Sequence, residues 1–273
     1  KELIETELSI EVLGCFTEQK ELHLESRHLG LKLPEEKRDL KEQVCRGAAS
    51  LKETVSIERI LAIGGAGEKD AAYQRADIKE KDTHESKLRL AIARDEAFCF
   101  YYQENLKLLS KMGFELVPFS PLHDKKLPEH ISGLLLGGGY PELHGEQLSQ
   151  NASMKQSICE AVEGGMPCLA ECGAFMYLHE EMEDADGRFW PMVGLVPGKA
   201  VKKGRLVRFG YAVLTSETDT ILGPKGLQMP VHEFHYWDTT CEEGCFKAHK
   251  PLTERRWHCM YQKKQLLAGF PHF

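Results

Sequence analysis

The feature that most constrains the fold of this chain is an alternation in its apolar residues. Short apolar runs alternate with a segment in which apolar residues recur at helical spacing. From residue 87 onward they predict strands over 88–93, 115–119, 134–136 and 168–170, and a helix over 102–112. Strands that alternate with helices favour a doubly wound sheet with parallel strands at its centre. In such sheets ligands bind beyond the carboxyl ends of the strands. The residues that follow 136 and 170 are therefore the first candidates for a site.

A cysteine follows the last of these strands. The small residues Ala170, Gly173 and Ala174 suit a sharp bend, and residues 175–178 are typical of the first turns of a helix. A thiol at this bend lies near the positive end of the helix, where unpaired backbone N–H groups favour the thiolate. The pattern predicts Cys172 as a nucleophile. A small, buried and inert cysteine is the alternative that the same pattern allows.

Three consecutive glycines end the strand predicted over 134–136. Residues 137–139 let a ligand approach bare backbone and expose N–H groups to a developing oxyanion, although a flexible turn fits the same residues. The ends of neighbouring strands converge at one edge of the sheet. We therefore predict the backbone N–H groups of Gly173 and Gly138 as oxyanion donors to an acyl group on Cys172.

Five ordered blocks of sequence carry a resemblance to a known family. They occupy residues 90–106, 119–124, 137–144, 170–173 and 232–236, and together they resemble the glutamine amidotransferase domain of cobyrinic acid a,c-diamide synthases. The resemblance implies a class I glutamine amidotransferase-like α/β fold over residues 87–273, with a mostly parallel sheet and antiparallel strands added at its edge after residue 178. It also implies that the domain is truncated at its C-terminus.

The histidine that assists the cysteine is harder to choose, because the chain has 12 histidines. In the family this residue lies near the C-terminus, which implies His272, with His235 as the alternative. The sequence departs from the family pattern at Phe270 and Pro271, where Tyr-Val is usual, and at Ala174, where a second glycine is common. It also stops one residue beyond His272, which predicts a frayed terminus and poor geometry for the base. The resemblance implies substrate contacts from Gly139, Tyr140, Glu171, His232 and His235.

The front of the chain resembles the end of the ATP-binding domain that precedes the amidotransferase domain in this family. We expect residues 1–63 to be the C-terminal remnant of that synthetase domain and residues 64–86 to be a linker. The resemblance places Arg27 and His28 near the acidic substrate, where they would pair with carboxylates, although their loop would equally serve to pack the domains together. No glycine-rich phosphate loop occurs, and the chain begins at Lys1 rather than Met. We therefore expect a fragment without its nucleotide site, in which no cofactor binds, while the full enzyme uses ATP and Mg²⁺.

The resemblance implies an ATP-dependent carbon–nitrogen ligase with glutamine as the amido donor. The full enzyme would amidate the a and c acetate carboxylates of cobyrinic acid, or of a related tetrapyrrole, in cobalamin biosynthesis. This fragment would supply the ammonia. A nickel-sirohydrochlorin a,c-diamide synthase carries the same blocks. A stand-alone cysteine hydrolase and a non-catalytic module of the same fold are further alternatives, and a homodimer stays open.

Composition excludes several other classes of protein. A net charge of -7 leaves no basic footprint for nucleic acid, and no apolar stretch reaches the roughly 18 residues that span a bilayer. Nine cysteines at irregular spacing indicate reduced thiols and a cytoplasmic protein. The group formed by Cys241, Cys245, His249, His258 and Cys259 lacks paired zinc-ligand spacing, so we predict no metal site, with zinc as the alternative.

Overall fold

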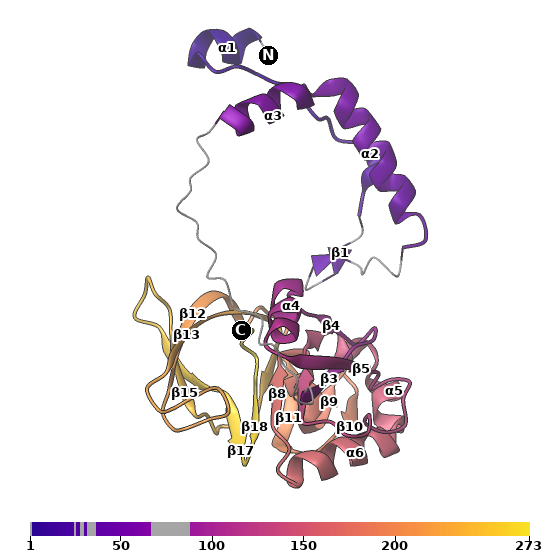
Figure 1. Ribbon diagram of the computed structural model, residues 1–273, viewed down its shortest axis with the longest axis vertical. Coiled ribbons are helices and arrows are strands. Elements are labelled where there is room, and N and C mark those ends of the chain that lie inside the picture. The colour runs from indigo at the N-terminus through magenta and orange to yellow at the C-terminus, as the bar shows by residue number, and fades with distance from the viewer. Residues whose placement is uncertain (1, 25, 28–29, 32–36, 67–87) are drawn as a thin grey trace. The chain divides into compact units, whose positions relative to one another are not determined.

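The computed structural model describes residues 2–24, 26–27, 30–31, 37–66 and 88–273 (Figure 1). The chain divides into two compact units, Lys1–Asp77 and Ile78–Phe273. Each unit is described by itself. Among the described residues, no helix is both long enough and apolar enough to cross a membrane.

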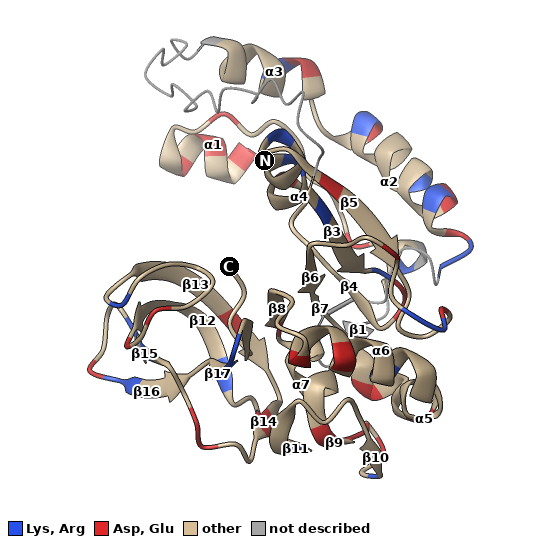
Figure 2. Ribbon diagram, turned by 60° about the horizontal axis from the view of Figure 1, so that its bottom comes forward, with Lys and Arg blue, Asp and Glu red and all other residues tan. Residues whose placement is uncertain are grey.

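The first unit is mostly helical. Its elements are α1 (Glu2–Leu8), η1 (Lys20–Leu22), β1 (Ser26–Arg27), β2 (Gly30–Leu31), α2 (Leu40–Thr54) and α3 (Ile57–Ala66). Charged residues recur along α2, which buries none of its residues (Figure 2). Gly14 forms an isolated bridge with Val55, and no described strand pairs with the segment around it.

The predicted linker and the predicted substrate contacts of Arg27 and His28 fall partly or wholly outside the described residues. Residues 64–66, expected in the linker, continue α3, and residues 67–87 lie outside the described residues. Arg27 lies in the short strand β1, where only its backbone is described, and His28 lies outside the described residues. The substrate contacts expected of these two residues stay predictions.

The second unit is built on a six-stranded sheet. Its strand order is β17-β18-β8-β6-β3-β5, and every neighbouring pair is parallel except β17 with β18. The order reverses at β3, which β5 and β6 flank, so the doubly wound sheet expected from the sequence is confirmed. The strands are β3 (Leu88–Ala93), β5 (Phe114–Phe119), β6 (Gly133–Leu136), β8 (Cys168–Glu171), β17 (Tyr261–Lys263) and β18 (Leu266–Gly269).

Helices cover this sheet. They are α4 (Gln103–Lys111), η3 (Pro141–Leu143), α5 (Gly145–Gln150), α6 (Ala152–Glu163) and α7 (Gly173–Leu178). Helix α6 buries Met154, Ile158 and Val162, which recur every four residues and form one apolar face. These side chains belong to the same core cluster as Leu134 of β6, and Figure 1 shows α5 and α6 alongside the sheet.

The remaining strands form sheets of their own. One contains β9 (His179–Glu183), β10 (Phe189–Pro191), β11 (Val196–Lys202) and β14 (Trp237–Thr239), and the other contains β12 (Arg208–Ser216), β13 (Gln228–His235), β15 (Phe246–His249) and β16 (Arg256–Cys259). A further short pair, β4 (Phe98–Phe100) with β7 (Gly138–Gly139), lies after β3 and β6.

The sequence predicts antiparallel strands at the edge of the main sheet, but only β17 extends that edge. The sheet of β12, β13, β15 and β16 buries a second apolar cluster, in which Leu214 and Phe246 pack with Leu267 of β18. Figure 1 shows this orange-to-yellow sheet beside β17 and β18. Packing face against the main sheet buries these side chains, whereas lateral pairing would leave them on an open face.

Candidate active site

Cys172 lies on a strained turn between β8 and α7. Its backbone angles are φ 49° and ψ −105°, a region that costs a non-glycine residue of order 1–3 kcal/mol. Its N–H donates to the carbonyl of Gly269 at 2.7 Å, and every residue of α7 is buried, so both sides of the turn are held. Strand, sharp turn and helix appear in the order that the sequence predicts. This geometry aims a side chain at the carboxyl edge of the sheet.

His272 lies beside Cys172. Its ring is hydrogen-bonded to the Cys172 side chain, and its Nδ1 lies 3.5 Å from Oε2 of Glu171. Burial alone would lower the pKa of His272, but the charge on Cys172, the hydrogen bond to it and the contacts with Glu171 raise this pKa to about 10. His272 therefore carries a proton at neutral pH, and this proton lies beside the sulfur of Cys172.

Gly138 and Gly173 allow the glycine loop to lie close to Cys172 and His272. A Cβ at Gly138 would lie 2.8 Å from Cε1 of His272 and 3.4 Å from the Cβ of Cys172. A Cβ at Gly173 would lie 3.1 Å from the backbone nitrogen of Gly139. Real side chains do not tolerate the first distance, so the absence of a side chain at Gly138 is what lets the imidazole lie against this loop.

Tyr101 is a residue whose place in the site the sequence did not reveal. Its hydroxyl donates to the carbonyl of Ala93 and accepts the N–H of Gly137 at 2.8 Å. Burial raises the pKa of Tyr101, so it stays a neutral donor and acceptor. A phenol that bridges the ends of two strands leaves no short-range signal.

The segment that carries His272 is held at its backbone. The N–H of His272 donates to the carbonyl of His232 at 2.9 Å, and the N–H of His232 donates in return at 3.1 Å. Phe270 is 6% exposed and Pro271 is buried, so the expectation of a frayed segment is wrong. Burial, and then the positive charges of His272 and Lys250, lower the pKa of His232.

His235, the alternative base, has other partners. Its Nδ1 donates to the carbonyl of Trp237 at 2.7 Å, and its ring stacks on Phe270 with centroids 4.0 Å apart and planes 3° from parallel. Its Nε2 lies 3.9 Å from Oε1 of Glu233. The structure thus brings His272, rather than His235, into hydrogen-bonding contact with Cys172.

Two other predicted substrate-contact residues, Glu171 and Tyr140, differ in their surroundings. Glu171 reaches the site through His272, and its side chain is 14% exposed. Tyr140 is 2% exposed and packs its ring against Phe100 at 5.0 Å, so its side chain lies in the core and not on an open surface. Any contact that Tyr140 makes with a ligand would therefore come from its backbone.

No group of three His, Cys, Asp or Glu side chains suited to a metal ion occurs among the described residues. Within the cluster weighed as a zinc site, His258 instead pairs with Glu217 at 3.2 Å, and Cys245 donates its thiol to the carbonyl of Met260. Burial raises the pKa of Cys245 to about 11 and also raises that of Cys259.

Comparisons with known proteins give a consistent result. A model of the CobB/CobQ-like glutamine amidotransferase domain matches residues 89–273. A protein named cobyrinate a,c-diamide synthase from Caldanaerobacter subterraneus subsp. tengcongensis is 38% identical over 277 residues, covering 100% of this chain and 60% of that protein. One of the same name from Dehalococcoides mccartyi (strain ATCC BAA-2266 / KCTC 15142 / 195) is 42% identical over 240 residues, covering 86% and 51%.

This chain therefore spans between about half and 60% of the length of these two relatives. Among solved structures, PurLQS from Thermotoga maritima superposes with a TM-score of 0.49 and 16% identity, over 68% of this chain and 88% of that one.

Proposed function

Because the chain belongs to the CobB/CobQ-like glutamine amidotransferase domain family, we propose that its second unit hydrolyses glutamine at Cys172 and releases ammonia. The observation that supports this most directly is the hydrogen-bonded pair of Cys172 and His272, placed on a strained turn beside the glycine loop. A cysteine that served only to fill the core would require neither a charged imidazole beside it nor a strained backbone.

The proposed reaction has two halves. The thiolate of Cys172 attacks the amide carbon of glutamine, and the resulting oxyanion accepts hydrogen bonds from the N–H groups of Gly173 and Gly138. His272 gives its proton to the leaving nitrogen as the carbon–nitrogen bond breaks, which releases ammonia and leaves a glutamyl thioester. A water then gives a proton to His272 and attacks the thioester, and glutamate leaves as the thiolate returns.

Glu171 has a positioning role in this scheme. Its carboxylate lies 3.5 Å from Nδ1 of His272, so it holds the ring with Nε2 toward Cys172 and stabilises the charged imidazole. The backbone hydrogen bonds with His232 fix the same residue from the other side. His272 is thus oriented at both its side chain and its main chain.

We propose for the full-length protein that the ammonia amidates the a and c acetate groups of cobyrinic acid, with ATP and Mg²⁺ activating the carboxylates. The names of the two relatives support this substrate. In this proposal the first unit is the end of the ATP-dependent domain, and Arg27 and His28 face the acidic substrate. All nine cysteines are free thiols, which fits a reducing cytoplasm.

Alkylation by diazo-oxo-norleucine, an electrophilic mimic of glutamine, tests the glutaminase proposal. We expect stoichiometric labelling of Cys172, located by peptide mass spectrometry, and protection of this residue by glutamine. Cys45 is exposed and is the internal reference for ordinary thiol reactivity. Labelling of Cys172 no faster than Cys45, in both this chain and the full-length protein, would remove the basis of the proposal.

A further inference from the structure

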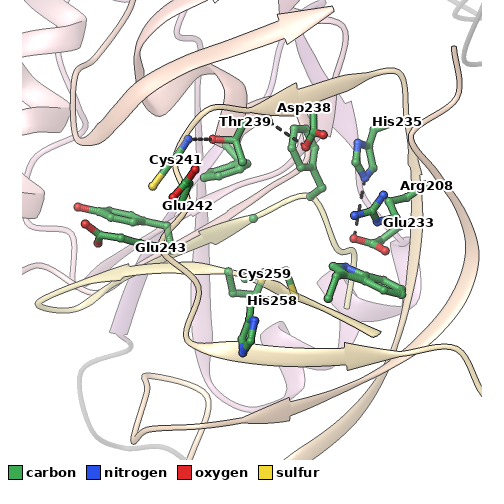
Figure 3. A pocket seen from close by; sticks show the side chains of 16 residues that line it. Arg208, Glu233, His235, Asp238, Thr239, Cys241, Glu242, Glu243, His258 and Cys259 are labelled. Carbon is green, nitrogen blue, oxygen red and sulfur yellow. Dashed lines mark hydrogen bonds and ion pairs between the residues drawn. The ribbon is translucent and has the colours of Figure 1, made fainter. Parts of the chain in front are cut away.

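A second cavity lies in the same unit, lined by residues other than Cys172 and His272. Its volume is about 310 Å³, and its walls come from β12, β13, β16 and the segment around Phe270. Figure 3 shows Arg208, Glu233 and His235 grouped at one end, with Cys241 and Glu243 at the other. A water molecule occupies about 30 Å³ in the liquid, so the cavity has room for a larger guest.

Three buried polar atoms at one end of this cavity have no hydrogen-bond partner. They are Nε of Arg208, Oε2 of Glu233 and Nε2 of His235. Glu233 is 1% exposed and His235 is 3% exposed. Of the four such atoms in the part of the chain that the structure describes, only the hydroxyl of Tyr177 lies elsewhere. Each unsatisfied group costs about 1–3 kcal/mol, so in the folded protein these three atoms must be met by polar atoms of water or of a bound molecule.

The three atoms define what that molecule must offer. The Nδ1 of His235 donates to a carbonyl, and with its single ring proton used there the ring presents Nε2 as an acceptor. Oε2 of Glu233 is also an acceptor, whereas Nε of Arg208 is a donor. The complement is a group with two hydrogen-bond donors and one acceptor close together. A primary carboxamide, with its NH₂ and its carbonyl oxygen, has this pattern.

The charged residues that line the cavity further restrict which molecule it can bind. The guanidinium of Arg208 and the carboxylate of Glu233 cancel, so a neutral group suits this end of the cavity. Asp238, Glu242 and Glu243 add three carboxylates to the lining. A carboxylic acid of the same shape would bring a negative charge among them and would offer no N–H to Glu233.

We propose that this cavity is a second binding site, which takes a small molecule bearing a primary carboxamide. The amide NH₂ donates to Glu233 and His235, and the amide oxygen accepts from Arg208. The site is independent of the glutaminase proposal, because neither Cys172 nor His272 lines the cavity.

Propionamide and its acid analogue propionate test the proposal on the full chain. Trp257 lines the cavity, with the guanidinium of Arg208 at 5.0 Å from its ring, so its indole N–H resonance is a local reporter. We expect propionamide to shift this resonance saturably and propionate to leave it in place. The indole of Trp190, which donates to Asp184 outside the cavity, is the internal control.

Substitutions inside and outside the cavity test where propionamide binds. Arg208→Met removes the donor to the amide oxygen and is expected to weaken propionamide binding on the order of tenfold. Glu233→Gln is expected to weaken it to a similar degree. Cys172→Ala should leave the Trp257 shift unchanged, which separates this cavity from the candidate active site. Tyr177→Phe, which removes the fourth unpartnered atom, is the matched control and should also have no effect.

Three outcomes would overturn the proposal. The first is equal binding of propionate and propionamide. The second is no shift of Trp257 by propionamide up to its solubility limit. The third is an unchanged affinity in Arg208→Met, which decides the matter should Glu233→Gln fail to fold. Each of these results leaves the alkylation test at Cys172 unaffected, so the two proposals stand or fall separately.

Discussion

Two histidines in the second unit each lie near a glutamate, yet their surroundings differ. His272 lies between Cys172 and Glu171, and its neighbours raise its pKa to about 10. His235 donates to a backbone carbonyl, stacks on Phe270 and lies 3.9 Å from Glu233. Only the first ring lies between a cysteine and a glutamate. The partners of both ring nitrogens, and not the nearness of a carboxylate, therefore decide which histidine is suited to proton transfer.

The largest expected effect comes from removing the sulfur nucleophile. Cys172→Ser should lower kcat for glutamine hydrolysis on the order of 10⁴-fold or more, because a hydroxyl is far less acidic than a thiol. Glutamate release measures the loss. Cys168→Ser, at a buried thiol four residues earlier, is the matched control and should retain hydrolysis as long as it folds. Equal losses in both variants would indicate damage to packing and not to the reaction.

The comparison of the two histidines is tested by making the same change at each. His272→Asn should lower kcat on the order of 10³-fold, since it removes the proton carrier beside Cys172. His235→Asn should change kcat less than about tenfold, because its ring has no contact with Cys172 and acts through packing. Single-turnover release of ammonia distinguishes the two variants. The reverse order of effects would make His235 the base.

The close approach at Gly138 predicts a smaller loss. In Gly138→Ala the new methyl group would lie 2.8 Å from Cε1 of His272, so the ring must move and kcat should fall on the order of 10²-fold. Gly133→Ala is the control, because its methyl group would meet a flexible Leu90 side chain at 3.3 Å. Circular dichroism should be unchanged in both. Full activity in Gly138→Ala would show that the ring position is unimportant.

A third histidine, His179, extends the comparison of histidine surroundings to the pH dependence of stability. Burial lowers the pKa of His179 to about 4, despite its hydrogen bond to the carbonyl of Phe175. Its folded pKa lies below the ordinary value of about 6.5, so its contribution to stability is full above pH 6.5 and is lost as pH falls toward 4. The loss should approach about 3 kcal/mol.

Urea unfolding at several pH values measures this loss. His179→Gln should flatten the dependence between pH 6.5 and 4. An unchanged slope in the His179 variant would mean that other groups govern the acid sensitivity.

The sequence allowed the parallel sheet and the Cys172 turn to be predicted because both depend on short-range patterns. The strands are short apolar runs, and the turn has small residues on both sides of the cysteine. The bond from Tyr101 to Gly137 and the pairing of His232 with His272 were not predictable, because each joins residues 36 or more apart. The two further sheets escaped prediction for the same reason, since edge pairing and face packing produce the same alternation along a strand.

The two main-chain hydrogen bonds between His232 and His272 link the proposed proton carrier to the hairpin of β12 and β13. The sulfur, in contrast, belongs to the parallel sheet. Local melting of that hairpin would release the imidazole while leaving the thiol on an intact scaffold. Catalytic competence should consequently vanish at a lower temperature than the sheet itself, and the gap between those temperatures would report the stability of the hairpin.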